Sequence, residues 1–248
     1  MNDTVQIIPL LRLALMMAPV AVVLLVFQRW SVGWRTGAYA IGRMLVQLTL
    51  VGYILVFIFE TDSGLIVISV LTVMLLAASW IALRPLQKER RSQYPLALAS
   101  IAIGGVLTLV LVTQGVLDLA TWHQGRFVIP LAGMIFAGSM NAVSLAAERF
   151  AAERERGQAY AEARFSAYRA ALIPIMNSLF AVGVVSLPGM MTGQILAGIA
   201  PHLAVRYQIM VMAMIFGASG VSAACYLVFV ESRGRGENPD KAGGQRSS

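Results

Sequence analysis

A proline–glycine pair inside a long apolar segment is the feature of this sequence that most suggests a functional site. The stretch SLPGMMTG contains Pro188, Gly189 and Gly193. Proline removes a helical hydrogen bond and clashes with the preceding turn, so we expect the helix to kink or break here. Freed backbone carbonyls and the hydroxyls of Ser186 and Thr192 would then be available to a ligand. Such breaks recur at substrate sites within membranes.

Less specific roles are also open for these residues. The two glycines form a small-xxx-small pair, and close helix packing alone could explain them. Thioethers such as those of Met190 and Met191 suit soft cations such as Cu(I), but methionines in apolar helices are usually packing residues. We apply the packing interpretation to Met134, Met140, Met176, Met210, Met212 and Met214 as well. The predicted substrate-pathway residues are Asn141, Asn177, Ser186, Pro188, Gly189, Met190, Met191, Thr192 and Gly193.

Several other kinds of chemistry find no support in the sequence. Cys225 is the single cysteine and His123 and His202 are the two histidines, so neither a disulfide framework nor a thiolate cluster is expected within one chain. No metal-ligand set can be assigned. The sequence lacks a G-x-x-x-x-G-K-[ST] loop, and its two lysines (Lys88 and Lys241) have no Gly-rich context. We therefore expect no enzyme and no cofactor bound by this chain.

The composition places the chain in a membrane. Hydrophobic residues make up 58% of the 248 positions and charged residues only 12%, whereas a soluble domain carries about 25% charged residues. The net charge of +7 could suggest nucleic-acid binding, but the basic residues lie in loops between apolar blocks. The absence of an acidic residue from any apolar segment argues against a proton-driven transporter.

Seven apolar segments are long enough to span a bilayer as helices. They are Ile7–Phe27, Tyr39–Phe59, Leu65–Leu83, Leu96–Val116, Phe127–Ala146, Leu172–Ala197 and Tyr207–Val230. Because backbone polar groups must be satisfied without water, the predicted fold is all-α and polytopic. The first segment is expected to be a retained helix, since Asp3 stands where a signal peptide would be basic.

Loop charges predict the orientation of these helices. Of the 19 basic residues, 16 lie in or beside the loops after the first, third and fifth segments or in the C-terminal tail. The other three are Arg12, Arg126 and Arg206. The positive-inside rule then places the N-terminus outside and the C-terminus in the cytoplasm of an inner (plasma) membrane. We expect one transmembrane domain over residues 1–230 and a disordered cytoplasmic tail over residues 231–248.

The loop Glu148–Arg169 is polar and rich in good helix formers. Gly157 could mark a bend between two short helices. An apolar stripe at helical spacing comprises Ala161, Phe165, Tyr168 and Leu172. The loop could lie on the membrane surface, extend the neighbouring helices, or dock onto a partner protein.

Three stretches resemble the FetB/YbbM family of ABC permeases, which includes the bacterial iron-export permease and the plant aluminium-sensitive type subunits. They are RMLVQLTLVG (Arg43–Gly52), PLAGMIFAGSMNAVSL (Pro130–Leu145) and the long run from Arg169 to Val211 that holds SLPGMMTG. The resemblance covers essentially the whole chain. Family members usually have a longer loop before the sequence RAALIP, with a Leu-Ala-Leu-Gly-Ala type element that is absent here.

The resemblance implies an exporter subunit in metal homeostasis, paired with a separate ATPase that uses the ATP. A homodimer is expected, because seven helices are few for an ABC pathway. The candidate coupling residues are Arg154, Arg156, Gly157, Tyr160, Glu162 and Arg164. A stand-alone channel and a non-transporting scaffold stay open as alternatives. The substrate could be iron or a related metal, a chelated metal, a neutral solute or a sugar nucleotide, since no membrane segment holds a carboxylate for a hard ion.

Overall fold

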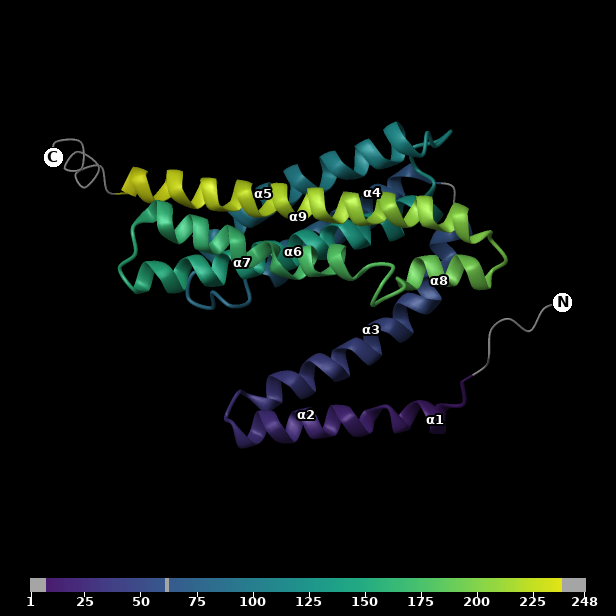
Figure 1. The fold of residues 1–248 in the computed structure, drawn as a ribbon, viewed down its shortest axis with the longest axis horizontal. Helices are drawn as coiled ribbons and strands as arrows, with labels where there is room; N and C mark the ends of the chain where they lie inside the picture. The colour runs from purple at the N-terminus through teal and green to yellow at the C-terminus, as the bar shows by residue number, and fades with distance from the viewer. Residues whose placement is uncertain (1–7, 61–62, 238–248) are drawn as a thin grey trace. The chain divides into compact units, whose positions relative to one another are not determined.

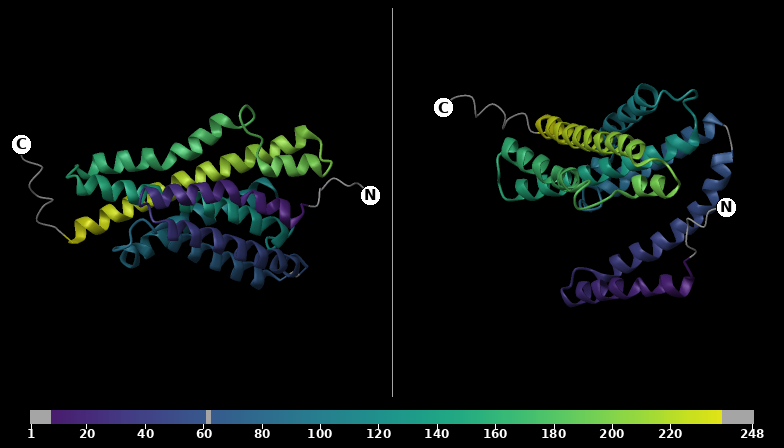
Figure 2. Two further views of the ribbon diagram at one scale, coloured as in Figure 1. Left: turned by 90° about the horizontal axis from the view of Figure 1, so that it is seen from below. Right: turned by 45° about the vertical axis from the view of Figure 1, so that its right-hand side comes forward.

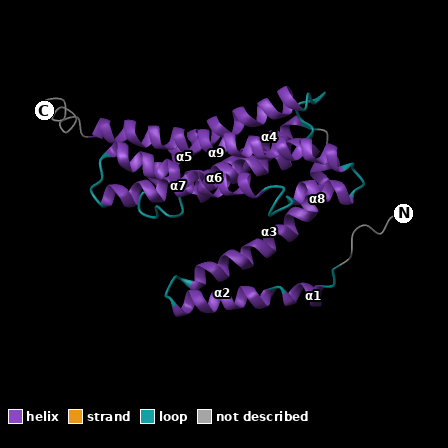
Figure 3. Cartoon of the chain, in the orientation of Figure 1, coloured by secondary structure: helices purple, strands orange, loops and turns teal. Residues whose placement is uncertain are grey.

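The computed structural model describes residues 8–60 and 63–237, which fold as two compact units divided after Thr61. Every regular element in these ranges is a helix, and Figure 3 draws no strand among them. The all-α prediction is therefore confirmed. The predicted tail boundary at residue 230 falls inside a helix, since the last helix continues to Glu237. Residues 238–248 lie outside the described residues.

The first unit contains α1 (Leu10–Leu15), α2 (Met17–Arg29) and α3 (Trp34–Glu60). Met16 separates α1 from α2. The helix is interrupted there because Pro19 has no N–H and its ring clashes with the carbonyl of Leu15 one turn earlier. Together they form one apolar stretch over Leu10–Arg29. Ser31 and Gly33 adopt positive φ and reverse the chain into α3. This unit is therefore a helical hairpin.

The second unit holds the remaining elements. They are α4 (Gly64–Ala82), α5 (Arg90–Val110), the π-helical turn η1 (Leu111–Val116), α6 (Gly125–Glu155), α7 (Tyr160–Ala181), α8 (Gly189–Leu196) and α9 (Pro201–Glu237). Helix α9 packs along α5 and α6, while α4 covers the other side of α5 and α6 (Figures 1 and 2). Helix α7 packs mainly against α6 and also against α9, and α8 packs against α9. The core is thus formed by α5, α6 and α9.

Six stretches of the described residues are long and apolar enough to cross a membrane. They correspond to six of the seven predicted segments. The other predicted segment, Leu172–Ala197, is discontinuous, because α7 ends at Ala181 and α8 begins at Gly189. The predicted break is therefore present, and the helix count agrees with the prediction when α7 and α8 are taken as one interrupted span.

Close backbone contact joins α5 to α9 in the core. A Cβ atom on Gly104 would lie 2.8 Å from the backbone nitrogen of Ser222 and 2.9 Å from the carbonyl oxygen of Ala218. Only glycine permits this approach of the two helices. A Cβ atom on Gly138 of α6 would likewise lie 2.8 Å from Ile215 of α9. Small residues at these crossings are typical of helix packing in membranes.

The ends of several helices meet where the predicted basic loops lie. The Arg233 Nη1 atom of α9 donates to the carbonyl oxygen of Ser92 at 2.6 Å, and the Arg164 guanidinium of α7 lies 2.7 Å from the Glu231 carboxylate of α9. The α4–α5 turn, the α6–α7 turn and the end of α9 therefore share one end of the unit (Figure 1). This agrees with the alternation of basic loops, and the side of the membrane that this end faces remains a prediction.

Candidate functional site

The break between α7 and α8 is a seven-residue segment, 182–188, and not a simple kink. Its backbone turns through Gly183, whose φ is +82°, and Val185 N–H and Ser186 N–H both donate to the carbonyl oxygen of Ala181. Pro188 takes an extended conformation (φ −62°, ψ 144°) directly before α8. Proline favours this position, because it cannot donate a hydrogen bond but can precede the first turn of a new helix.

Two apolar pockets flank the short helix α8, each with a volume of about 430 Å³. This is within the range of small-molecule sites. Consecutive methionines divide between them, since Met190 lines one pocket and Met191 the other. The break therefore places α8 as a partition between two cavities that both reach α9.

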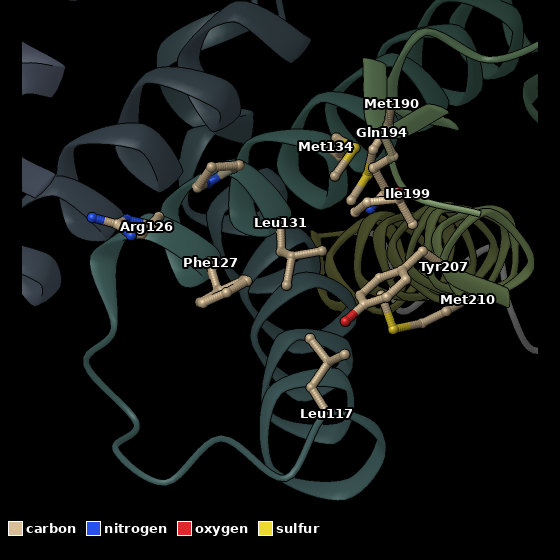
Figure 4. Close-up of a pocket in the computed structure, with 11 residues that line it drawn as sticks. Leu117, Arg126, Phe127, Leu131, Met134, Met190, Gln194, Ile199, Tyr207 and Met210 are labelled. Atoms are coloured by element: carbon tan, nitrogen blue, oxygen red, sulfur yellow. The ribbon is translucent and has the colours of Figure 1, made fainter. Parts of the chain in front are cut away.

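The first pocket lies between α6, α8 and the start of α9 (Figure 4). We call it the Met190 pocket. Figure 4 shows Met134, Met190 and Gln194 together at one end and Tyr207 and Met210 at the other, while the Arg126 guanidinium points away from the centre. Its lining comprises Leu117, Arg126, Phe127, Pro130, Leu131, Met134, Met190, Gln194, Ile199, Tyr207 and Met210. No carboxylate belongs to this lining within the described part of the chain.

The second pocket, which we call the Met191 pocket, lies between the end of α7, the segment 182–188 and α9. Its lining comprises Leu179, Val182, Gly183, Leu187, Met191, Val205, Gln208, Ile209, Met212 and Ala213. Gln208 is only 5% exposed, and its Oε1 atom has no hydrogen-bond partner among the described residues. The Gln194 Oε1 atom of the first pocket is also buried without a partner there. Each pocket thus contains one unsatisfied amide oxygen.

The predicted pathway residues are placed unevenly around this site. Met190 and Met191 line the pockets, but Asn141 on α6 and Asn177 on α7 are exposed and line neither of them. The Thr192 hydroxyl donates to the carbonyl oxygen of Pro188 at 3.1 Å, and this carbonyl also accepts the Thr192 N–H at 3.0 Å as the first backbone bond of α8, so it is not free for a ligand. Ser186 lies in the segment 182–188 with an exposed side chain.

Gly189 and Gly193 face open space within this chain. A Cβ atom built on either glycine would meet no described atom within 4 Å. Within residues 63–237 no other helix makes the close packing that their spacing allows, in contrast to Gly104 and Gly138. Nothing in that range covers this face of α8.

Sequence reasoning missed the two glutamines and Tyr207. A signal was present, because Gln194 and Gln208 are polar residues within otherwise apolar segments, and such residues usually have a purpose at membrane depth. The spacing of Met190 and Gln194 also places both on one face of α8. That Met134 of α6 would lie beside them could not be read from the sequence, because it depends on how the helices cross.

The predicted coupling loop forms a helical hairpin, made by the end of α6 and the start of α7. Of the interpretations left open, extension of the neighbouring helices is the one observed. Gly157 adopts φ +81° in the turn, the Arg154 Nη1 atom donates to the carbonyl oxygen of Gln158 at 2.8 Å, and the Arg154 guanidinium stacks on the Tyr160 ring. Arg156 lies near Glu153, with 3.4 Å between Nη1 and Oε1. The turn is therefore well braced.

The face of α7 that packs on the bundle is not the predicted apolar stripe. Ala163, Ala167 and Ala171 are buried, because their small side chains allow close approach to the neighbouring helices. The stripe residue Phe165 is 67% exposed instead. It joins Glu162 and four other residues around a shallow groove on the hairpin. The hairpin consequently presents an aromatic ring and the Glu162 carboxylate, which are exposed within this unit, whereas Glu153 is buried and ion-paired.

Comparison with known proteins places this architecture in a family. Residues 9–164 and 154–233 match UPF0014, described as an uncharacterised protein family. The two matched stretches overlap over residues 154–164, at the α6–α7 hairpin. The chain therefore belongs to the UPF0014 family of membrane proteins.

Three relatives carry informative names. The chain is 34% identical to the probable iron export permease protein FetB of Escherichia coli, over 88% of this chain and 89% of that protein. It is 36% identical to a UPF0014 membrane protein of Synechocystis, over 71% and 74% of the two chains. It is 29% identical to the protein ALUMINUM SENSITIVE 3 of Arabidopsis thaliana, over 75% and 72%. No solved structure matches this chain. These names support a membrane permease.

Proposed function

We propose that this chain is the membrane subunit of an ABC-type exporter in the inner membrane, which moves iron or a related metal and is driven by a separate ATPase. The observation that carries the proposal is the interrupted span between α7 and α8. Non-helical backbone at membrane depth is tolerated where protein covers it or where it lines a cavity. Here the break adjoins two pockets of substrate size, and a relative is named as an iron export permease.

The hairpin of α6 and α7 is the part of the chain suited to an ATPase. Its exposed Phe165 could enter a pocket on the partner, with the surrounding charges setting the orientation of the contact. The Arg164–Glu231 ion pair, at 2.7 Å, joins the hairpin to α9. Movement of the hairpin would thereby reach the helix that lines both pockets.

A second copy of the chain would complete the pathway. Val184 and Val185 in the segment 182–188 are 87% and 81% exposed. Backbone of this kind needs a cover in hydrocarbon, and valine side chains favour a protein cover over a water-filled cavity. We assign the cover to the same segment of the partner in a homodimer.

Affinity isolation of the tagged full-length chain from its own membranes tests the proposal. We expect an ABC ATPase to co-purify, and the reconstituted complex to move Fe²⁺ across vesicles only with ATP. Flux of the same size without ATPase or nucleotide would favour a channel or facilitator instead. Absence of both an ATPase and any flux would favour a membrane scaffold.

Charge reversal tests the link between hairpin and α9. We expect Arg164→Glu and Glu231→Arg to reduce ATP-driven flux separately, and the double exchange to restore part of it, because it brings opposite charges together again. Since the Glu231 side chain is only 14% exposed, the yield of folded protein is measured beside flux for each variant. Equal loss in the double exchange would show that the pair does not couple the two elements.

Cross-linking tests the dimer. In a Cys225→Ser background, Val184→Cys should give a cross-linked dimer with a short bifunctional maleimide, while Val73→Cys on α4, which is 65% exposed, should not. Equal cross-linking of both variants would contradict the assigned interface.

A further inference from the structure

The Met190 pocket combines donor atoms of a kind that its apolar walls do not require. Met134 comes from α6, and Met190 and Gln194 come from α8. Figure 4 shows these three side chains gathered at one end of the cavity. Two thioether side chains and one amide side chain from two helices therefore line the same end of the cavity.

The positions on α8 explain how two of the donors come to lie together. Met190 and Gln194 are four residues apart, which places them on one face of a helix. Pro188 fixes the start of that helix through its extended conformation. Met191 belongs to a different face and lines the other pocket. The position of the break thus determines that Met190, and not Met191, lies on the side of α8 that faces Met134.

Packing alone does not account for this arrangement. A methionine that only fills space is surrounded by other side chains, whereas these methionines border a volume of about 430 Å³. The Gln194 Oε1 atom is buried without a hydrogen-bond partner among the described residues. Buried polar atoms almost always have a partner, so an unpaired one in a cavity points to a missing ligand.

The donor set selects a particular class of ligand. Thioethers are soft, neutral donors that suit Cu(I), whereas hard ions such as Mg²⁺ and Ca²⁺ require carboxylate or carbonyl oxygens. The lining in the described residues contains no carboxylate, and the Arg126 guanidinium points away from the donors. No group of three or more His, Cys, Asp or Glu side chains suited to a metal occurs in the described part of the chain either. A bare hard cation would therefore find no neutralising ligands here.

We propose that the Met190 pocket binds a soft monovalent cation, Cu(I) or Ag(I), through the thioethers of Met134 and Met190 and the amide oxygen of Gln194. The site's role as a station for cargo rests on the proposed transport function, with Cu(I) or Ag(I) as the related metal that is moved beside or in place of iron. Binding itself needs neither an ATPase nor transport, so the two proposals can fail separately.

Titration of the purified full-length protein with Ag(I) tests the site. Ag(I) replaces Cu(I) because it is not oxidised in air, and every protein carries Cys225→Ser so that the thiol cannot capture the ion. We compare this background with Met134→Leu, Met190→Leu and the double variant. Met191→Leu is the matched control, since it removes the neighbouring thioether that lines the other pocket. Exchange of methionine for leucine conserves volume, so the fold should be retained.

We expect one Ag(I) per chain that is lost in the double variant and retained in Met191→Leu. Even indirect partners of a metal change affinity by about 10–100-fold, so each direct thioether should be worth at least about tenfold. X-ray absorption at the silver edge should show sulfur neighbours in the background protein and fewer in each single variant. Gln194→Leu should weaken binding without removing sulfur neighbours.

Unchanged affinity in the double variant, or an equal loss in Met191→Leu, would overturn the proposal. Tight binding of Fe²⁺ that outcompetes Ag(I) at this pocket would overturn it as well. Absence of Ag(I) binding in a chain that still transports iron with its ATPase would reject this site and leave the transport function standing.

Discussion

Helix α9 meets the rest of its unit in two contrasting ways. Against α5 it makes close backbone contact at Gly104, where no side chain fits. Against α8 it borders open pockets, and a Cβ atom on Gly189 or Gly193 of that helix would meet no described atom outside its own helical turn within 4 Å. Glycine therefore permits close packing on the α5 side, whereas the glycines of α8 are not packed against another described helix.

Polar groups differ only in part between the two sides of α9, because the Ser222 Oγ atom at the α5 contact is also buried without a hydrogen-bond partner among the described residues. The Tyr226 hydroxyl donates a hydrogen bond to the Gln93 Oε1 atom of α5 at 3.0 Å, so the amide oxygen of Gln93 has a partner. Gln208 on the α8 side is buried with its Oε1 atom unpaired among the described residues. A buried amide without a partner is unfavourable for stability. The close backbone packing on the α5 side is typical of a scaffold, whereas the pockets on the α8 side have the properties of a site that gives up stability for function.

The largest difference in stability between the two sides of α9 is expected when a glycine is replaced by a larger residue. Gly104→Val would drive a branched side chain into the backbone of α9, and we expect a loss of about 3 kcal/mol or more, at or above the upper end of overpacking effects. Thermal unfolding in detergent, with the yield of monodisperse protein, measures it. Gly193→Val is the matched control and should change stability by less than about 1 kcal/mol. A comparable loss in both variants would remove the contrast.

The next largest effect concerns the unpaired amide. Gln208→Leu replaces it with an apolar side chain and should raise stability by about 1–2 kcal/mol, because the desolvation penalty of an unsatisfied group disappears. Gln93→Leu on the α5 side should instead lower stability by about 1 kcal/mol, because it removes the acceptor of the Tyr226 hydroxyl. The measurement is chemical or thermal unfolding of both variants beside the parent. Two changes of the same sign would show that the glutamines are equivalent.

The scaffold was largely predictable from the sequence, and the site was not. Long apolar segments predict membrane helices because bilayer thickness fixes their length, and six of these segments correspond to stretches that are long and apolar enough to cross a membrane. The interruption was also predictable, since Pro188 cannot continue a helix. Its extent was not, because the turn begins at Val182, six residues earlier, through hydrogen bonds to the Ala181 carbonyl.

The residues of the pockets depend on contacts between helices, which a single sequence does not state. Asn141 and Asn177 have the polarity expected of a pathway but are exposed and line neither pocket. Met134 is of a residue type that usually only fills space in an apolar helix, but it borders the Met190 pocket. Likewise, the spacing of apolar residues on α7 predicts that Phe165 is buried. The buried face is instead made of alanines such as Ala167, whose small size favours close packing.

A smaller effect is expected from the single hydroxyl at the α5 contact. Tyr226→Phe keeps the buried ring and removes one hydrogen bond to Gln93, so stability should fall by about 1 kcal/mol. Combination with Gln93→Leu should add little, because both changes remove the same interaction. A double-variant cycle in thermal unfolding measures this. Full additivity would mean that the hydrogen bond between α5 and α9 does not form.

The smallest effect has the opposite sign and bears on function most directly. Gly193→Ala adds one methyl group to α8 where no described atom lies within 4 Å. Alanine restricts the unfolded chain and favours the helix, so the isolated chain should gain about 0.5–1 kcal/mol. If a second chain or a substrate approaches this face, as the exposed segment 182–188 suggests, ATP-driven flux should fall although stability rises. Parallel measurement of unfolding and flux separates the two. A gain in stability with unchanged flux would show that this face of α8 meets only lipid, and that the open side of α9 needs a different explanation.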